Sequence, residues 1–365
     1  MSILTFIIVL LVLVLVHELG HFAVAKWTGM RVDEFGFGFP PKLFGVRRGE
    51  TEYTFNLFPV GGFVKIYGED ALLEGEATHK DATSRSFMAK SKWAQSAVLL
   101  AGITMNILFA WVLVTLAFGL GVKSAVSEVE ATDTAVLAIT NVLPGGPAGD
   151  ATLTAGAVIR EVKAGADSLT TLTPSAFSAF IEAHSGVPVT IVYTMKGETR
   201  VVEITPEAGV IEGSDRPAIG VALTLIDTVS RTFMEAVVDA TVYVVTSFRD
   251  IAVGIGALLY DAVRLRADFS QVAGPVGIVG LVDEASSYGL TSLLLFTAFI
   301  SINLAVINVL PFPALDGGRL LFVIIEAVKG TPIKAQYVAI LNTAGFFILI
   351  LLMVLVTWND VARLL

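Results

Sequence analysis

Four apolar stretches in this sequence are each long enough to cross a lipid bilayer as a helix. A membrane-spanning helix needs about 20 consecutive apolar residues, and its backbone satisfies its own hydrogen bonds inside the lipid. Hydrophobic residues make up 55% of the 365, and the mean hydropathy is +0.77, values typical of a membrane protein. We therefore predict a polytopic α-helical membrane protein with four transmembrane helices. The stretches run approximately over Ile3–Ala25, Ala94–Gly121, Leu290–Val309 and Ala335–Thr357.

The first stretch contains two histidines separated by one helical turn, in the sequence His17-Glu18-Leu19-Gly20-His21. Both imidazoles share one face of a helix and can reach one metal ion, while Glu18 lies beside them and can act as a base on water. A charged residue at membrane depth costs roughly 2.5–3.5 kcal/mol on insertion scales, so such residues are usually functional. The motif predicts an intramembrane metalloprotease, and the alternative is a chance match on a buried helix.

A third metal ligand must come from elsewhere in the chain. Catalytic zinc takes three protein ligands and keeps an open position, so two histidines are too few. The chain has no cysteine, which leaves His, Asp and Glu side chains. His79 lies in a polar segment typical of an exposed loop, and His184 ends a predicted helix outside the membrane. We expect neither of them to bind the metal.

Asp316 is the remaining candidate. It lies in the segment Asn308–Arg319, where Pro311 and Pro313 end the third apolar stretch, because proline cannot continue a helix. Irregular backbone at membrane depth is tolerated only where it lines a cavity or is buried in protein. We expect Asp316 to complete the metal site, and the alternative is that it caps the helix that follows.

Residues 50–67 have the pattern of strand, turn and strand. Apolar and polar side chains alternate through Tyr53–Leu57, and Pro59–Gly62 turns the chain into Phe63–Tyr67. The edge of such a hairpin near a membrane metal site can hold an extended substrate by strand addition. A hairpin that only packs against the protein is the other interpretation, and these residues alone do not separate the two.

The segment between the two pairs of apolar stretches predicts an inserted α/β module. Residues 126–208 contain strands around Val136–Ile139 and Val158–Val162, a helix near Pro174–His184 and a hairpin that turns at Lys196-Gly197. We place this domain at residues 122–215. The membrane parts on either side are residues 1–121, with the first two helices and the hairpin, and residues 290–365, with the last two helices.

Residues 216–289 are expected to form an amphipathic segment on the membrane surface. On a helix over residues 232–264, with 100° per residue, all charged side chains fall within an arc of about 120°. A helix that is charged on one side lies along the interface or against the bundle and does not span lipid. Gly254 and Gly256 are expected to break it. The charged residues are Glu235, Asp239, Arg249, Asp250, Asp261 and Arg264.

Loop charges predict the orientation. Residues 26–93 hold ten Lys or Arg against nine Asp or Glu, whereas residues 122–289 hold ten against twenty. The short loop 311–334 carries Arg319, Lys329 and Lys334. By the positive-inside rule, the loops 26–93 and 311–334 face the cytoplasm and the long central region lies outside.

Together these features resemble the site-2 protease family of intramembrane zinc metalloproteases, specifically its bacterial RseP-like branch (regulator of sigma-E protease). The resemblance covers nearly the whole chain. The matching segments are His17–His21, Gly36-Phe37-Gly38, Pro59–Lys65, Ser86-Phe87, Ala101-Gly102 with Asn106, Ala273–Ile278, Asn308–Gly318 and Asn359–Leu364.

The resemblance implies a hydrolase that cleaves peptide bonds within membrane-spanning segments. Its substrates would be single-span membrane proteins already shortened by another protease, such as anti-sigma factors or remnant signal peptides. It also implies the bacterial inner membrane, an active site toward the cytoplasmic side, and an outer PDZ domain that excludes bulky substrates. The implied roles are Zn²⁺ binding by His17, His21 and Asp316, a general base at Glu18, and substrate contacts by Asn308, Pro313, Phe63, Val64 and Lys65.

Three positions depart from the family pattern. Ile103 stands where relatives often have Pro, Arg319 stands where they often have His, and Gly156-Ala157 replaces the usual Gly-Asp of the PDZ domain. Two other functions stay open, a metal-ion transporter that uses the same three ligands and an inactive scaffold whose outer domain binds peptides. The net charge of −9 argues against a nucleic-acid partner.

Overall fold

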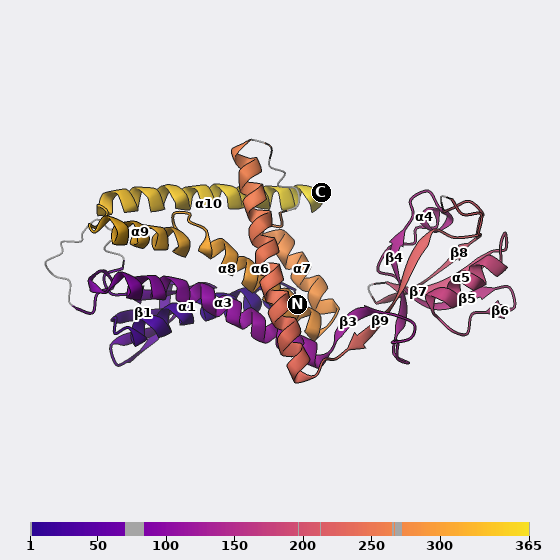
Figure 1. Cartoon of the computed structure of the whole chain (residues 1–365), viewed down its shortest axis with the longest axis horizontal. Helices are drawn as coiled ribbons and strands as arrows, with labels where there is room; N and C mark the ends of the chain where they lie inside the picture. Colours follow the sequence, from indigo (N-terminus) through magenta and orange to yellow (C-terminus); the bar gives the residue numbers. More distant parts are fainter. Residues whose placement is uncertain are drawn as a thin grey trace. The chain divides into compact units, whose positions relative to one another are not determined.

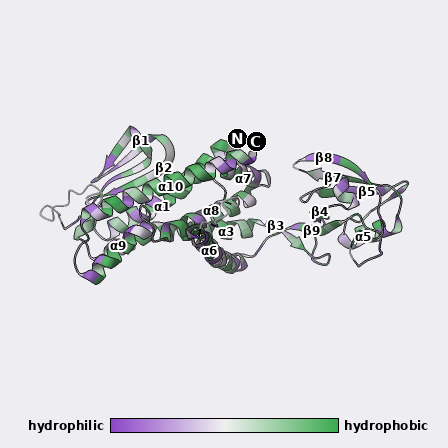
Figure 2. Cartoon of the chain, turned by 90° about the horizontal axis from the view of Figure 1, so that it is seen from above, coloured by the Kyte–Doolittle hydropathy of each residue, from purple (hydrophilic) through white to green (hydrophobic). Residues whose placement is uncertain are grey.

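The chain folds into two compact units. The structure is a computed structural model (Figure 1) that describes residues 2–69, 84–195, 197–211, 213–264, 266 and 272–364. The helical unit comprises residues 1–119 and 232–365, and the sheet unit comprises residues 120–231. His79, expected in a loop, lies outside the described residues. Figure 2 shows that the long helices are predominantly hydrophobic, whereas the sheet unit mixes hydrophobic and hydrophilic segments.

The helical unit contains the predicted membrane helices and one more long helix. Among the described residues, five helices are long and apolar enough to cross a membrane. α1, α3, α8 and α10 correspond to the four predicted stretches, and α6 is the fifth. The helices are α1 (Ser2–Trp27), the 3-10 helix η1 (Phe87–Ala89), α3 (Lys92–Leu120), α6 (Phe233–Val263), α7 (Pro275–Ser287), α8 (Leu290–Val309), α9 (Asp316–Lys329) and α10 (Ala335–Leu364).

Helix α6 differs from the prediction in one respect. It is unbroken from Phe233 to Val263, because a glycine inside a helix costs only about 1 kcal/mol relative to alanine, and Gly254 and Gly256 do not end it. In both Figure 1 and Figure 2, α6 runs across the direction of α3 and α10. Ala240 of α6 packs in a buried cluster with side chains of α3 and α8. By length and composition α6 qualifies as a span, and its surface position stays a prediction.

Strands β1 (Val32–Arg48) and β2 (Thr51–Ile66) pair with each other in the helical unit. One stretch of β1 pairs twice, since residues 34–37 pair with residues 62–65 and also with residues 52–55 of β2. Along residues 34–37 the partners rise from 52 to 55 but fall from 65 to 62, so these two segments of β2 run in opposite directions, and the predicted turn at Pro59–Gly62 lies at the end of the stretch between them. Within the described part of the chain, residues 62–66 pair only with β1, which leaves their other side as a free edge.

The sheet unit is built on an antiparallel sheet with the strand order β3-β9-β4-β5-β7-β8, and β6 pairs with β5. β9 pairs with both β3 and β4, so the unit extends to Arg231 instead of ending at residue 215. The elements are β3 (Val122–Val126), β4 (Val136–Val142), α4 (Pro147–Asp150), β5 (Val158–Ala164), β6 (Asp167–Ser168), α5 (Pro174–Ala183), β7 (Val189–Met195), β8 (Glu198–Ile204) and β9 (Val221–Val229).

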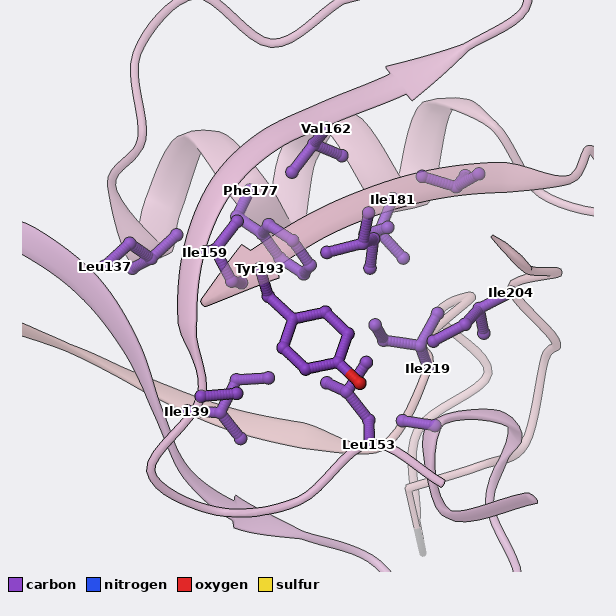
Figure 3. Close-up of a cluster of buried hydrophobic side chains, with 14 of the residues drawn as sticks. Leu137, Ile139, Leu153, Ile159, Val162, Phe177, Ile181, Tyr193, Ile204 and Ile219 are labelled. Atoms are coloured by element: carbon purple, nitrogen blue, oxygen red, sulfur yellow. The ribbon is translucent and has the colours of Figure 1, made fainter. Parts of the chain in front are cut away.

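The core of the sheet unit lies between the sheet and α5 (Figure 3). Leu137, Ile159 and Tyr193 come from three strands, and Phe177 and Ile181 come from α5. These apolar residues alternate along the strands and recur on one face of the helix, which is why the sequence predicted an α/β module.

Hydrogen bonds to Asp227 join β9 to the segment that precedes β4. Its carboxylate accepts hydrogen bonds from the Thr132 backbone N–H at 2.8 Å, the Thr132 hydroxyl at 2.7 Å and the Thr134 hydroxyl at 2.9 Å. These donors, the Thr132 N–H first among them, lower the pKa of the Asp227 carboxyl to about 2. The carboxylate therefore stays ionised at neutral pH and keeps all three bonds.

Candidate metal centre

Two glycines bring α1 and α3 into close contact at the histidine pair. A Cβ atom added at Gly20 of α1 would lie 2.7 Å from Met105 Cγ of α3. A Cβ atom added at Gly102 of α3 would lie 2.7 Å from Cε1 and 2.8 Å from Nε2 of His17, and would also collide with His21 Nε2. Small residues let membrane helices approach this closely. His17 and His21 are consequently buried in the α1–α3 interface, each 7% exposed.

The two imidazoles converge on Asp316. His17 Nε2 lies 3.0 Å and His21 Nε2 lies 3.3 Å from Asp316 Oδ2, and the two Nε2 atoms are 3.1 Å apart. In the part of the chain that the structure describes, these residues are the one group of three or more His, Asp or Glu able to hold a metal ion. The structure thus brings together the three residues that the sequence singled out as ligands.

The geometry of this group suits zinc. Ligand atoms about 2.0–2.1 Å from a tetrahedral zinc ion lie about 3.3 Å from one another, close to the three measured separations. Asp316 Oδ2 is buried and makes no hydrogen bond within the described part of the chain, so a metal ion can use it. Two imidazoles and one carboxylate are a donor set that catalytic zinc accepts, with a fourth position left for water.

Helix α3 also contacts the outer nitrogens of both histidines. His21 Nδ1 lies 2.8 Å from the carbonyl oxygen of Val98, and His17 Nδ1 lies 3.2 Å from the side-chain amide of Asn106. Val98, Gly102 and Asn106 follow one another at intervals of four residues and so share one face of α3. The motif on α1 does not reveal these contacts, because the spacing acquires meaning only once α3 is known to face α1.

Glycines also shape the backbone around Asp316. Asp316 is the first residue of α9 and does not occupy its cap position. A Cβ atom at Gly317 would lie 2.5 Å from the carbonyl carbon of Val309, and one at Gly318 would lie 2.6 Å from that of Phe312. The tight turn that presents Asp316 to α1 therefore has no room for larger residues at these two positions.

Helix α10 supports the loop that leads into α9. Asn342 Oδ1 accepts a hydrogen bond of 3.1 Å from the backbone N–H of Ala314, whose φ is +73°. Positive φ is uncommon for a residue other than glycine, so this bond stabilises a strained turn. A Cβ atom at Gly345 would lie 2.6 Å from the carbonyl oxygen of Pro313, which shows how closely α10 packs behind the loop.

Arg319 forms an ion pair with a residue that follows β2. Its Nη1 lies 2.7 Å from Oε1 of Glu69, a buried residue that follows β2. The ion pair joins α9 to the end of β2 and engages the basic side chain nearest to Asp316 in sequence. Within the described residues, Asp316 faces His17 and His21.

Glu18 lies beside the bend of β2. A Cβ atom at Gly62 would be 3.7 Å from Glu18 Cγ and 3.7 Å from Val14 Cγ1, so β2 follows the side of α1 that carries the predicted base. Residues 62–66, which have the free edge, begin at this contact. The structure thus places a strand edge next to the histidine motif.

The remaining predicted residues occupy separate places. Phe63, Val64 and Lys65 lie in the edge segment of β2, Asn308 lies in the last turn of α8, and Pro313 packs on Gly345 of α10. Their contacts with a substrate stay a prediction. His184 ends α5 in the sheet unit, where its Nδ1 lies 2.8 Å from the carbonyl oxygen of Phe180.

Comparison with known proteins identifies the family. The family model described as peptidase family M50 matches residues 5–352. The chain belongs to peptidase family M50.

Zinc metalloprotease RasP of Geobacillus kaustophilus is 30% identical, over 99% of this chain and 98% of that protein. Regulator of sigma-W protease RasP of Bacillus subtilis is 29% identical, over 100% of this chain and 99% of that protein. The PDZ domain of an SdrC-like protein of Listeria monocytogenes matches 26% of this chain and 92% of its own, with 24% identity and a TM-score of 0.21.

Membership of M50 confirms the sequence-based identification of a site-2 type zinc metalloprotease. The chain is a membrane-bound hydrolase, and its cofactor is Zn²⁺. The metal-ion transporter and the inactive scaffold are not favoured, because the family model spans both membrane parts and the full-length relatives are named as proteases.

Proposed function

We propose that His17, His21 and Asp316 bind the zinc ion and that Glu18 is the general base for hydrolysis of a peptide bond inside the membrane. The observation that carries this proposal is the convergence of two Nε2 atoms and one carboxylate oxygen within 3.3 Å of one another. His17, Glu18 and His21 lie on a helix otherwise composed almost entirely of apolar residues. Ionisable residues in such a helix are costly and generally serve a function.

The metal ion and the side chains around it have different roles in hydrolysis. Zinc, when bound, polarises a peptide carbonyl and lowers the pKa of water to about 7. Glu18 accepts the proton of the attacking water and passes it to the leaving amine. His21 is held through the Val98 carbonyl, and the buried interface keeps bulk water from the histidine pair.

We propose that the substrate binds as an extended segment along residues 62–66 of β2. Peptide bonds within a membrane helix are already hydrogen-bonded, so the helix must open before its carbonyls can react. A free strand edge offers backbone partners to the opened segment, and this edge begins beside Glu18. Phe63, Val64 and Lys65 would line the edge, and Asn308 and Pro313 would contact the substrate near the metal.

The proposed substrates are single-span proteins of a bacterial inner membrane that another protease has shortened. The name of the Bacillus subtilis relative, a regulator of sigma-W protease, supports anti-sigma factors as one class. We place the metal site toward the cytoplasm and the sheet unit outside, as a PDZ domain. In this topology α1, α3, α8 and α10 cross the membrane, and α6 lies along its surface, which its crosswise course supports (Figure 1).

A variant of the base separates catalysis from metal binding. Glu18→Gln should lower cleavage of a model single-span substrate by about 10²–10⁴-fold or more, because an amide cannot accept the proton. Its zinc content should equal that of wild type. His17→Ala, His21→Ala and Asp316→Ala should lose both zinc and activity. Glu284→Gln, at an exposed position of α7, is the matched control.

Two results would contradict the assignments. Activity of Glu18→Gln within a few-fold of wild type would remove Glu18 as the base. Undiminished zinc affinity in Asp316→Ala would remove Asp316 as the third ligand while leaving the question of the base untouched. Metal analysis and single-turnover cleavage of the same purified samples give both answers.

A further inference from the structure

The outer nitrogen of His17 needs a hydrogen-bond acceptor. An imidazole that binds a metal through Nε2 is neutral and carries its proton on Nδ1, and the partner of that N–H fixes both the tautomer and the ring orientation. For His21 this partner is the Val98 carbonyl oxygen at 2.8 Å. For His17 the group at hydrogen-bond distance is the side-chain amide of Asn106, at 3.2 Å.

The Asn106 amide has two possible orientations, and they are chemically different for His17. With Nδ2 toward His17 Nδ1, the amide donates, and His17 must accept through the nitrogen that should carry the proton. Oδ1 is then buried without a hydrogen-bond partner. The two ends of an amide have nearly the same shape, so the network decides between them. Rotating the amide by half a turn brings its oxygen to His17 Nδ1 as an acceptor.

We propose that Asn106 is a positioning residue whose amide oxygen accepts the Nδ1–H of His17 and so presents His17 Nε2 to the metal. This inference rests on the proposed zinc site. Three further observations support this role. It is fully buried, with 0% exposure. Its backbone carbonyl accepts a hydrogen bond of 2.8 Å from the Ser301 hydroxyl of α8. It also lies one helical turn after Gly102, where the missing side chain leaves room for the rings of His17 and His21.

The two histidines are therefore oriented by one face of α3. Val98 supplies a backbone oxygen for His21, Gly102 supplies the space, and Asn106 supplies a side-chain oxygen for His17. The backbone oxygen cannot be removed by mutation, whereas the side-chain oxygen can. Asn106 is thus the member of this face whose contribution to metal affinity can be measured directly.

The test compares Asn106→Leu with Asn106→Asp in the full-length protein in detergent. Leucine has a similar size but no acceptor, so the zinc affinity should fall by about 10–100-fold, the usual effect of removing a partner of a metal-bound histidine. Aspartate places an oxygen at the same position whether or not it is ionised, so its zinc affinity should stay near that of wild type. Affinity is measured with zinc itself, by competition with a chromophoric chelator.

A second measurement separates orientation from general damage. With Co²⁺ in place of zinc, Asn106→Leu should alter the visible absorption bands of the metal site and Asn106→Asp should preserve them. Asn303→Leu is the matched control, because the side chain of Asn303 donates an intrahelical hydrogen bond of 2.9 Å to the carbonyl oxygen of Phe299 in α8. It should leave both zinc affinity and the Co²⁺ spectrum unchanged.

The outcomes are distinguishable. Wild-type zinc affinity in Asn106→Leu, or equal losses in Asn106→Leu and Asn106→Asp, would overturn the inference. If Asn106→Leu fails to fold, Asn106→Asp decides alone, since a tenfold loss of affinity in a folded aspartate variant also overturns it. If His17→Ala retains zinc, the proposed metal site itself is wrong, which is a different result.

Discussion

Gly102 leaves no room for a side chain beside the two histidines of the metal centre. Both imidazoles lie against its α-carbon, and an added methyl group would sit 2.8 Å from His17 Nε2 and would collide with His21 Nε2. Those two atoms are the ones that face Asp316 at 3.0 and 3.3 Å. A single methyl group on α3 therefore acts directly on the predicted ligand atoms, although Gly102 itself can bind no metal.

We predict that Gly102→Ala lowers zinc affinity at least about tenfold, in the range found for residues that orient metal ligands, and lowers proteolysis with it. The methyl group must push the histidines away or separate α3 from α1. Gly119→Ala is the matched control on the same helix, because an added Cβ there meets no atom within 4 Å. Zinc titration of both variants is the measurement, and equal affinity in the two would show that the rings have room to move.

At the scale of the elements, the sequence predicted the features that the bilayer and the local residue types determine. The apolar stretches located α1, α3, α8 and α10 because a bilayer sets the length of each helix. Asp316 could be found because prolines break the helix before it. The double pairing of β1 and the place of β9 in the sheet could not be predicted, because strand partners depend on segments distant in the sequence. The contacts of Val98 and Asn106 depend on which faces of two helices meet, which neither helix reveals alone.

Hydrogen bonds join two of the segments that resemble the family, Ala273–Ile278 and Asn359–Leu364. Asp360 of α10 accepts hydrogen bonds from the backbone N–H groups of Gly274, at 3.1 Å, and Gly277, at 2.8 Å. It therefore caps the N-terminus of α7 from another helix. A Cβ atom at Gly274 would lie 2.6 Å from Asp360 Oδ2, so glycine is needed for the carboxylate to approach.

We predict that Asp360→Ala loosens α7 specifically. Loss of a capping carboxylate typically costs about 0.5–2 kcal/mol, and here the two N–H groups would lose their partner in a buried site. Amide hydrogen exchange of the first turn of α7 should accelerate, while exchange in α3 stays the same. Asp283→Ala, an exposed carboxylate within α7, is the control. Unchanged protection of α7 in Asp360→Ala would show that packing alone holds the helix.

At the scale of the whole molecule, the role of α6 decides the topology. With four spans, the sheet unit lies outside and the segment after α9 lies in the cytoplasm. If α6 were a fifth span, the segment after α9 would instead face the same side as the sheet unit. The chain has no cysteine, so single cysteines at Glu198, whose side chain is 71% exposed, and at exposed Lys329 report on the two segments.

We predict that an impermeant thiol reagent added outside the cell labels Glu198→Cys and does not label Lys329→Cys. Permeabilising the membrane should make both positions reactive, which controls for local burial. Labelling of both positions in intact cells would establish α6 as a span, and labelling of Lys329→Cys alone would reverse the orientation.

The sheet unit is predicted to act as a filter for substrates. In the proposed topology the unit lies outside while the scissile bond lies within the membrane, so we predict that it excludes substrates with bulky outer domains. Excising the predicted α/β module at residues 126–208 would leave β9 without its partner β4. The register offers a cleaner deletion, because Val126 of β3 faces Leu225 of β9. Residues 127–224 can be replaced by Asn-Gly, which closes an antiparallel pair as a two-residue hairpin.

This deletion should permit cleavage of full-length, untrimmed substrates and leave the rate on trimmed substrates nearly unchanged. The reason is that a filter acts on entry, whereas the metal centre is built entirely from the helical unit. Cleavage of matched trimmed and untrimmed substrates is measured with the intact protein and the deletion variant, both checked for bound zinc. If the unit instead recruits substrates by binding a newly exposed C-terminus, the deletion slows cleavage of the trimmed form. A folded, zinc-loaded deletion variant that still rejects untrimmed substrates would end the filter hypothesis, because size exclusion would then have to reside in the membrane helices.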